Sequence, residues 1–551
     1  MVALTSFYKA PFSLNINFWI IGSWFVSLVF LAPIFSIVLT SFGDSGGLWA
    51  HLYQNVLAKY IINTLQLMIG VSFVVLIFGV STAWIVSRYN FYGHKYFEWL
   101  LMLPAACPAY LVAYAYTDFF EYAGPIQVGL RDFFNWQTSK DYWFPEIRST
   151  GGAIFVMSSV LYPYVYVLAR TSFKKSPSSF YEIAKIYNKN AFFSVGLPLA
   201  RPAIIAGLAL VSMEVISDFG TVEFFALETL TLGIFNVWLG MNSLTAAAQI
   251  SVVAFIFIIS LLYIELKSRS NKRFSDNTQR QTSMRKLDLS FSRNFICVVI
   301  CSLPIIFGFL IPVLLLALYS LKTSYHQNWT ELFLITSNTI LSAATGAIII
   351  MTLGTFLAVV SFYKGKKSTR NIIALASTGY AFPGTMLSIG VLVFCGFFDN
   401  IYVSILSFFS GNAHYGLLSG TIFLLIFSYV IRFQAVGYGA LMSGINQVPP
   451  NLMDASLSMG KSFKQSFQLI VFPLLKTSIL AGGLLAFVDI MKELPMTLLL
   501  RPFNFETLAT YAYQFAHDEL IEQAALPSLL IISAGLLPVI FMNKFLMENR
   551  T

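Results

Sequence analysis

Two pairs of carboxylates stand in apolar segments of the sequence, where a charge is costly. Glu214 and Asp218 form one pair, in SMEVISDFGTVEFF. Asp489 and Glu493 form the other, in FVDIMKELPMTLLLRPFNFETLA. The spacing predicts that the two acids of each pair share one helix face. A charge at the centre of a bilayer costs roughly 2.5–3.5 kcal/mol, so we expect the acids to face a wet interior. Because carboxylate oxygens bind hard cations, the pattern favours a cation path.

The same residues also have a purely structural interpretation. Lys492, within the second segment, would neutralise one acid, and the other acids would form a network near the membrane edge. The five histidines show no HxxxH or HExxH spacing, so the sequence gives no support for a histidine metal site. Both interpretations of the acids stay open on these residues alone.

The composition predicts the environment in which these acids must be held. The chain has 551 residues, of which 57% are hydrophobic and only 11% charged. Soluble proteins carry about a quarter charged residues. The balance excludes a disordered chain, disfavours a cytosolic enzyme and predicts a polytopic protein with the lipid bilayer as its partner. We assign the net charge of +9 to cytoplasmic loops and expect no nucleic-acid partner.

Twelve apolar runs are long enough to cross a bilayer as helices, which requires about 20 residues each. They lie near residues 18–42, 60–87, 97–120, 152–172, 199–222, 246–266, 294–318, 337–362, 372–397, 416–442, 477–500 and 526–545. We therefore expect an all-α membrane protein with a six-helix half at 1–266 and another at 294–551. The basic, polar stretch 267–293 between them is expected to be an exposed cytoplasmic linker.

The distribution of basic residues predicts the orientation. With the N-terminus inside, 27 of the 34 Lys and Arg residues fall on cytoplasmic segments or helix ends, Arg432 among them. This bias agrees with the positive-inside rule. Because the number of spans is even, both termini are expected to be cytoplasmic.

The two halves repeat each other at an offset of 275 residues. The offset relates Pro108 to Pro383, and it also relates Glu214 to Asp489. The same spacing joins Pro198 to Pro473, Gly207 to Gly482 and Asp218 to Glu493. Since each half begins on the same side, these are parallel repeats. A pathway between the halves is the natural place for a solute.

Each half also has a polar segment between its fourth and fifth spans, at 181–204 and 453–480. The first contains Glu182 and Ala184, and the second contains Asp454, Ala455 and Gly460. The acids suit the first turn of a short helix, where the dipole favours negative charge. Small residues would let a partner surface approach, and the glycine would end the helix.

This order of residues resembles the EAA loop of ABC importer permeases, which docks into a groove of the cytoplasmic ATPase. The first copy departs from it, since Asn188 stands at the glycine position and three residues fewer precede the proline. The resemblance implies two copies of a partner ATPase. A P-loop-like string at 455–462 has alanine where the first glycine is required and has no preceding strand, so we expect this chain to bind no ATP or other cofactor.

The strings EVISDFGTVEFF and MKELPMTLLLRPFNFETLA, with AALP at 524–527, are similar to the ferric iron permeases of binding-protein-dependent ABC importers. The similarity runs over essentially the whole chain. It implies a fused twelve-span transport subunit in a bacterial inner membrane, not an enzyme, and a periplasmic or extracellular ferric-binding protein. Cargo would be Fe³⁺, driven inward by ATP hydrolysis in the partner.

Other functions remain open on the sequence. Fused permeases for thiamine and related permeases for polyamines share the architecture, and both carry cations. An ion-coupled secondary transporter or a membrane-embedded enzyme would be a different class of protein. At the outer face, Arg131 and Arg501 could grip a docking protein through charge. Solvated loops with interfacial aromatic anchors are the alternative for those segments.

Overall fold

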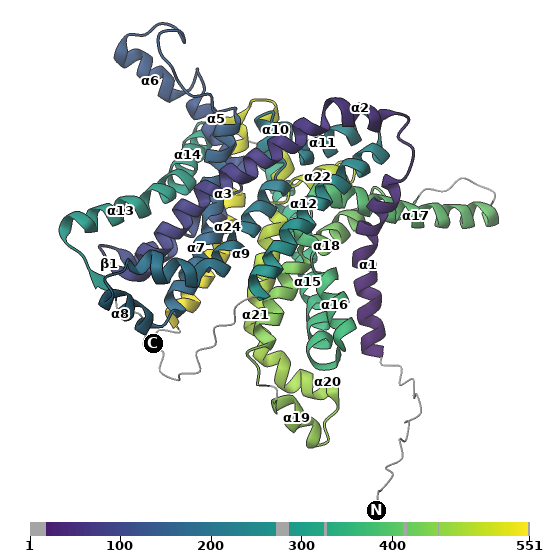
Figure 1. The fold of residues 1–551 in the computed structure, drawn as a ribbon. Coiled ribbons are helices and arrows are strands. Elements are labelled where there is room, and N and C mark those ends of the chain that lie inside the picture. Colours follow the sequence, from purple (N-terminus) through teal and green to yellow (C-terminus); the bar gives the residue numbers. More distant parts are fainter. Residues whose placement is uncertain (1–17, 271–285, 324–327, 411–415, 450, 549–551) are drawn as a thin grey trace, which may run out of the picture.

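The computed structural model describes residues 18–270, 286–323, 328–410, 416–449 and 451–548 (Figure 1). These ranges are almost entirely helical, with one short parallel strand pair among them. The predicted all-α fold class is thereby confirmed.

The elements before residue 271 begin with a long helix and end with another. They are α1 (Phe18–Ser41), α2 (Leu48–Asn55), α3 (Leu57–Arg88), β1 (Tyr89–Asn90), α4 (His94–Leu100), η1 (Leu103–Ala106), α5 (Ala109–Phe120), α6 (Pro125–Phe134), α7 (Thr150–Lys175), α8 (Ser178–Ile186), η2 (Phe192–Gly196), α9 (Leu197–Ser217), α10 (Gly220–Phe224), α11 (Leu230–Phe235), η3 (Asn236–Gly240) and α12 (Leu244–Ser270).

The elements after residue 285 repeat much of this order. They are β2 (Leu287–Asp288), α13 (Phe291–Ile305), η4 (Ile306–Leu310), α14 (Ile311–Thr323), α15 (Trp329–Val359), η6 (Val360–Lys364), α16 (Lys367–Ala376), η7 (Gly379–Ala381), α17 (Gly384–Ser410), α18 (Ile422–Ile445), α19 (Asn451–Ser458), α20 (Phe463–Ser466), η8 (Phe467–Val471), α21 (Phe472–Met491), α22 (Pro495–Leu500), α23 (Leu508–His517) and α24 (Ile521–Glu548).

Within the described ranges, 11 helical segments are long and apolar enough to cross a membrane. A twelfth span exists if the bent pair His94–Ala106 and Ala109–Phe134 counts as one, and its parts meet at 87°. The predicted span at 97–120 is therefore a broken one. The break falls at Pro108, which has no N–H to continue a helix. The second half breaks at the equivalent Pro383, directly after η7.

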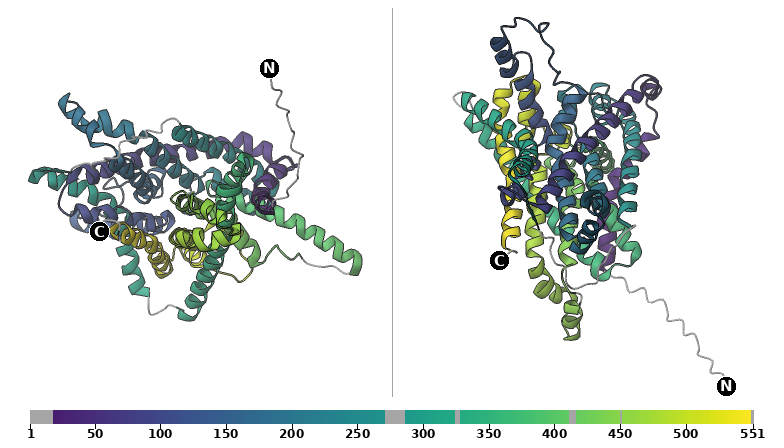
Figure 2. Two further views of the ribbon diagram at one scale, coloured as in Figure 1. Left: turned by 90° about the horizontal axis from the view of Figure 1, so that it is seen from below. Right: turned by 60° about the vertical axis from the view of Figure 1, so that its left-hand side comes forward.

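The short helices that connect the long ones lie at two opposite ends of the molecule. The short helices α8, α19 and α20 lie at one end, and α2, α6, α10 and α11 lie at the other (Figures 1 and 2). α24 runs toward the end that carries α8 (Figure 1). The two segments predicted to couple to an ATPase thus lie at the same end, opposite α6, which carries Arg131.

The first helix of the chain packs onto the second half. α1 lies against α16 and α17, as well as against α12 of its own half. Trp24 Nε1 donates a hydrogen bond to Thr369 Oγ1 at 3.2 Å. Gly390 of α17 touches the carbonyl oxygen of Pro33 so closely that any side chain there would collide with the α1 backbone. The two halves are therefore interlocked rather than merely adjacent.

Much of the predicted linker, residues 271–285, lies outside the described residues. Its far end is exposed but not free, because β2 pairs in parallel with β1. Lys286 Nζ lies 3.5 Å from the carboxylate of Glu98, which also pairs with Arg170 at 2.7 Å. The linker end is thus fastened to the first half. The boundaries of the predicted halves stay predictions.

Candidate functional site

The helical path breaks at the end of the first acid-bearing span. α9 ends at Ser217, and Asp218 has extended backbone (φ −65°, ψ 129°) before α10 begins at Gly220. The Asp218 carboxylate accepts hydrogen bonds from the backbone N–H groups of Thr221 at 3.0 Å and Val222 at 3.2 Å. It thereby caps the amino end of α10, where backbone donors and the helix dipole favour a negative charge.

The second half repeats this break. α21 ends at Met491, and α22 begins at Pro495. Glu493 Oε1 accepts a hydrogen bond from the backbone N–H of Met496 at 3.1 Å, three residues on, as in the first half. The prediction that Asp218 and Glu493 each share a helix face with the acid four residues earlier is therefore wrong. Both acids lie beyond the helix end, in the unwound turn.

The two breaks face one polar cavity of about 120 Å³ between the halves. All four predicted acids line it, together with two cations and three tyrosines: Glu214, Asp218, Asp489, Glu493, Arg432, Lys492, Tyr110, Tyr164 and Tyr380. Irregular backbone at membrane depth is tolerated where it lines such a cavity. The structure thus brings the two acidic segments together across the repeat interface.

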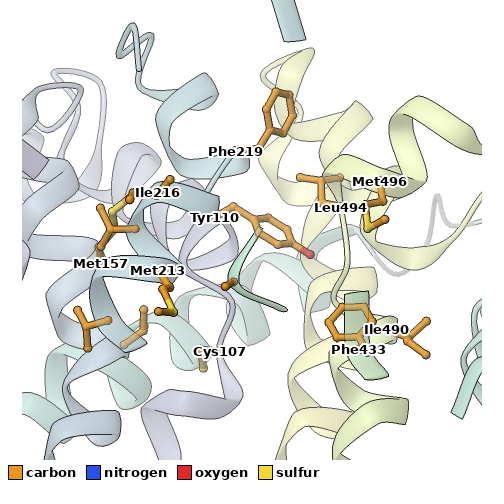
Figure 3. Packing of buried hydrophobic residues seen from close by; sticks show 14 of the residues in the cluster. Cys107, Tyr110, Met157, Met213, Ile216, Phe219, Phe433, Ile490, Leu494 and Met496 are labelled. Atoms are coloured by element: carbon orange, nitrogen blue, oxygen red, sulfur yellow. The ribbon is translucent and has the colours of Figure 1, made fainter. Parts of the chain in front are cut away.

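Tyr110 occupies the middle of this interface. In Figure 3 its ring lies between the ribbons of the two halves, with Cys107 and Met213 on one side and Leu494 and Phe433 on the other. The Tyr110 hydroxyl donates a hydrogen bond across the interface to the backbone carbonyl of Lys492, at a long 3.4 Å. The aromatic ring links the two broken helices at the level of the acids.

Both acids of the second half are paired with cations. Lys492 Nζ lies 2.8 Å from Asp489 Oδ1. Arg432 Nη1 lies 2.9 Å from Glu493 Oε1, and the side chains of this pair are only 8% and 6% exposed. Arg432 was expected at a cytoplasmic helix end, and that expectation is wrong: it is buried within α18. A buried guanidinium is stable there because the Glu493 carboxylate faces it.

The acids of the first half have different partners. The Tyr380 hydroxyl donates a hydrogen bond to Glu214 Oε1 at 2.5 Å. Asp218 accepts bonds from the start of α10 and from the Thr221 hydroxyl at 3.0 Å. Within the described part of the chain, neither acid has a Lys, Arg or His within ion-pair distance. The negative charge of the cavity is therefore concentrated on its first-half side.

A larger, mostly apolar chamber of about 710 Å³ adjoins the polar cavity. Tyr164, Tyr380, Asp489 and Lys492 line both spaces, so they stand at the boundary between them. A solute leaving the cavity by this route would pass from carboxylates to a surface with few polar atoms. Such a surface offers an ion little to bind.

The position along each helix shows on which side the chamber lies. In α9, which follows α8, Leu210 and Met213 line the chamber, and Glu214 follows them at the cavity. In α18, which leads to α19, Arg432 lines the cavity, and Val436 follows it at the chamber. The chamber therefore lies between the acids and the end of the molecule that carries α8 and α19.

The first predicted coupling segment forms α8. Glu182 is exposed there, whereas the side chain of Ala184 is only 5% exposed and packs inside the chain rather than offering a partner surface. Large apolar residues are exposed on the same helix, with Ile183 at 50% and Ile186 at 80%. An apolar surface of this kind is typical of a contact site for another protein.

The second coupling segment forms α19, on which Asp454 and Ala455 are exposed. Met459, just past its end, is 75% exposed. Gly460 follows with φ +81° and has no heavy atom within 4 Å of the position a side chain would take. It ends the helix with a left-handed residue, a conformation that strains other residues.

The first copy ends in the same way despite lacking the glycine. Asn188 has φ +51°, and asparagine is one of the few residues that readily adopt this conformation. The N–H of Lys189 donates to the carbonyl of Ala184, as the N–H of Lys461 does to that of Ser456. The missing residues instead correspond to α20, an extra helical turn of the second copy.

The two arginines proposed for docking are engaged within the chain. Arg131 donates a hydrogen bond to the Tyr142 hydroxyl at 3.0 Å and lies over the ring of Tyr122. Arg501 forms an ion pair with Glu506, and burial lowers the pKa of its guanidinium. Neither contact excludes a docking role, which stays a prediction, because each guanidinium keeps further N–H donors.

Sequence reasoning correctly paired Lys492 with an acid, but it missed Arg432 and the phenolic part of the site. Arg432 is a single charge inside the predicted span 416–442, and that isolation is the signal that could have placed it in the interior. Tyr164 and Tyr380 carry no comparable signal, because tyrosine is common in membrane helices. Among the described residues, no group of three or more His, Cys, Asp and Glu side chains is arranged to hold a metal ion.

Comparison with known proteins agrees with this architecture. The family model of the binding-protein-dependent transport system inner membrane component matches residues 75–268. The Fe(3+)-transport system permease protein FbpB 2 of Haemophilus influenzae is 22% identical over 502 residues, which cover 90% of this chain and 91% of that protein. The ferric transport system permease protein FbpB of Actinobacillus pleuropneumoniae is 24% identical, over 80% of this chain and 64% of that protein.

A shorter relative helps to explain the length of the chain. The sulfate transport system permease protein CysT of Escherichia coli K12 is 26% identical over 266 residues, which are 91% of that protein but only 45% of this chain. One half of this chain is thus comparable in length to a complete permease. With the helical bundle and the cavity between its halves, the chain is similar over almost its whole length to the inner-membrane permeases of the binding-protein-dependent transport systems, and residues 75–268 match the model of that family.

Proposed function

We propose that this chain is the transmembrane subunit of an ATP-driven importer for ferric iron, which an external binding protein delivers. The observation that carries the proposal is the similarity to a ferric permease over 90% of the chain. The cavity supports it, because its four carboxylates and its phenols are oxygen groups, which hard cations prefer. Glu214, Asp218, Asp489 and Glu493 are the candidate transit path.

Two exposed segments suit two copies of an ATPase. α8 and α19 lie at one end of the molecule and carry acids, apolar side chains and matching helix ends. We propose that Glu182, Asp454, Ala455 and Gly460 couple ATP hydrolysis to the spans behind them, while Ala184 packs α8 onto the chain. ATP would bind to the partner, not to this chain.

The binding protein would dock at the opposite end, and the end with α8 and α19 would face the cytoplasm. Arg131 and Arg501 are candidate docking residues there. This orientation puts both termini in the cytoplasm, in agreement with the bias of basic residues.

Anions are a second class of possible cargo, because a sulfate permease is among the relatives. The charge of the cavity disfavours an anion, since four carboxylates face only Lys492 and Arg432 there. An organic cation, such as thiamine or a polyamine, agrees with that charge as well as Fe³⁺ does. Cargo identity therefore depends on the similarity to the ferric permeases.

The test is ATP hydrolysis by the chain assembled with its ATPase in nanodiscs. Candidate binding proteins would be added empty or loaded with Fe³⁺, thiamine, a polyamine or sulfate. We expect stimulation by the ferric-loaded protein alone. Stimulation by a different loaded protein would overturn the iron assignment. Uptake that needs no ATPase and is abolished by an uncoupler would instead indicate a secondary transporter.

A further inference from the structure

The repeat offset of 275 residues shows where the two sides of the cavity differ. It relates Asp489 to Glu214 and Glu493 to Asp218, so the acids correspond. The cations do not correspond. The counterpart of Lys492 is Ser217, and the counterpart of Arg432 is Met157. All eight positions line the same cavity.

In the second half, each acid therefore has a cation built into the chain. Lys492 Nζ is 2.8 Å from Asp489 Oδ1, and Arg432 Nη1 is 2.9 Å from Glu493 Oε1. These tethered cations mark where a positive charge is stable in this fold. A free cation could bind the second-half acids only by displacing a charge that is covalently attached beside them.

In the first half, the corresponding positions carry neutral side chains. Met157 is fully buried at the cavity wall. Ser217 lines the cavity and is only 7% exposed, and its buried hydroxyl has no hydrogen-bond partner among the described residues. A buried hydroxyl without a partner is costly, and it is satisfied if a ligand binds beside it. This serine is independent evidence for a ligand position, beyond the acids themselves.

We propose that the cavity holds one cargo-cation site, on its first-half side, formed by Glu214, Asp218 and the hydroxyl of Ser217. The ligand class is a hard cation that binds oxygen groups, and under the proposed function, on which this inference rests, it is Fe³⁺. The negative charges of Asp489 and Glu493 are balanced by Lys492 and Arg432, and these two acids do not bind the cargo.

The size of the cavity and the small number of ligands fit a transit site. Its volume of about 120 Å³ is well above the ~10–15 Å³ that one water needs on the same measure, so an ion could keep several waters. Two carboxylates and one hydroxyl would hold such an ion less firmly than a complete ligand shell. The Tyr380 hydroxyl, which is hydrogen-bonded to Glu214, lies at the boundary to the apolar chamber, where the ion would leave the cavity.

The test places a tethered cation in the first half. Ser217→Lys copies the residue that the second half carries at the equivalent position. In nanodiscs, the chain assembled with its ATPase would be dialysed against ferric nitrilotriacetate, and bound iron would be counted. Uptake driven by a ferric-loaded binding protein would be measured in proteoliposomes. S217K should abolish both binding and uptake, while assembly with the ATPase persists.

A comparison of variants at equivalent positions in the two halves keeps the proposal testable if S217K does not fold. Glu214→Gln removes a ligand, whereas the pair D489N/K492M removes an acid together with its own cation. Because outer-shell groups alone cost 10–100-fold in metal affinity, we expect at least about a tenfold loss of iron binding for E214Q and less than about threefold for D489N/K492M. Ser217→Ala should weaken binding less than E214Q does.

Two outcomes would overturn the inference. One is full iron binding by S217K, and the other is an equal loss of binding in E214Q and D489N/K492M. If the unmodified chain neither binds iron nor responds to the ferric-loaded protein, the proposed function fails as well. If it responds to that protein but the two sides of the cavity prove equivalent, only the asymmetric site is refuted.

Discussion

Removal of the Arg432 guanidinium should destabilise the chain strongly, and removal of both partners should not. The Arg432–Glu493 pair joins α18 to the break before α22 through a 2.9 Å contact, with both side chains less than 10% exposed. Breaking a buried pair by removing one member costs about 3–5 kcal/mol, because the other charge stays buried without its partner. Glu493 would keep its hydrogen bond from the Met496 N–H, which favours the lower end of that range.

We therefore expect Arg432→Met to lose about 3 kcal/mol of folding free energy. That loss is roughly a hundredfold in the unfolding equilibrium, since each 1.4 kcal/mol is tenfold. The double variant R432M/E493Q removes both charges and retains an oxygen for the Met496 N–H. It should lie within about 1 kcal/mol of the unmodified chain, because replacing a whole buried pair is often neutral.

The assay is unfolding in mixed micelles with increasing SDS, followed by tryptophan fluorescence. Arg432→Lys provides a matched control, because it keeps the charge but loses the planar guanidinium, and it should fall between the other variants. The reasoning would be refuted if R432M were as stable as the unmodified chain. It would also fail if the double variant were no more stable than R432M, since the cost would then not come from an unpaired Glu493.

Three further changes probe other parts of the structure. Gly384→Ala should lower the free energy of unfolding by about 1–3 kcal/mol in the same SDS titration, because the added methyl group would collide with Arg432 and Glu493. Its control is Gly439→Ala in α18, where nothing lies within 4 Å, and this change should leave the free energy of unfolding unaltered. In Gly460→Val, the left-handed backbone conformation would strain the valine by about 1–2 kcal/mol, so ATPase stimulation should fall. Asn188→Gly should keep full stimulation. Glu98→Gln should destabilise the chain by about 3–5 kcal/mol, measured by the midpoint of SDS unfolding, because it leaves a cluster of cations without its carboxylate.

The architecture was predictable because a bilayer imposes strong constraints on sequence. Long apolar runs, the bias of basic residues and the repeat offset can all be recognised in the sequence without knowledge of any contact. They predicted the helical bundle and the convergence of four acids between the halves. The bent segment around Pro108 shows the limit, since hydropathy detects an apolar run but not an 87° break within it.

The details of the site depend on contacts that no local pattern encodes. Asp218 and Glu493 were placed on helix faces, but each instead caps a second helix that begins two residues later. The role of Arg432 depends on Glu493, which is 61 residues away in sequence. Asn188 is a case in which the sequence suggested a larger difference than the structure shows. It stands where glycine was expected, yet its φ of +51° shows that it adopts the same left-handed conformation.

The packing of α1 against α17 has a consequence for the synthesis of the chain. More than 300 residues separate the two helices, so at about 5–20 residues per second α1 is complete for roughly 20–70 s before its partner exists. During that time α1 must persist in lipid without its final neighbours. It can do so because its 24 residues contain no charged side chain, so no charge in it has to be neutralised by another helix. The acid-bearing helix α9 has no such freedom, because Glu214 needs the hydroxyl of Tyr380, which is synthesised later.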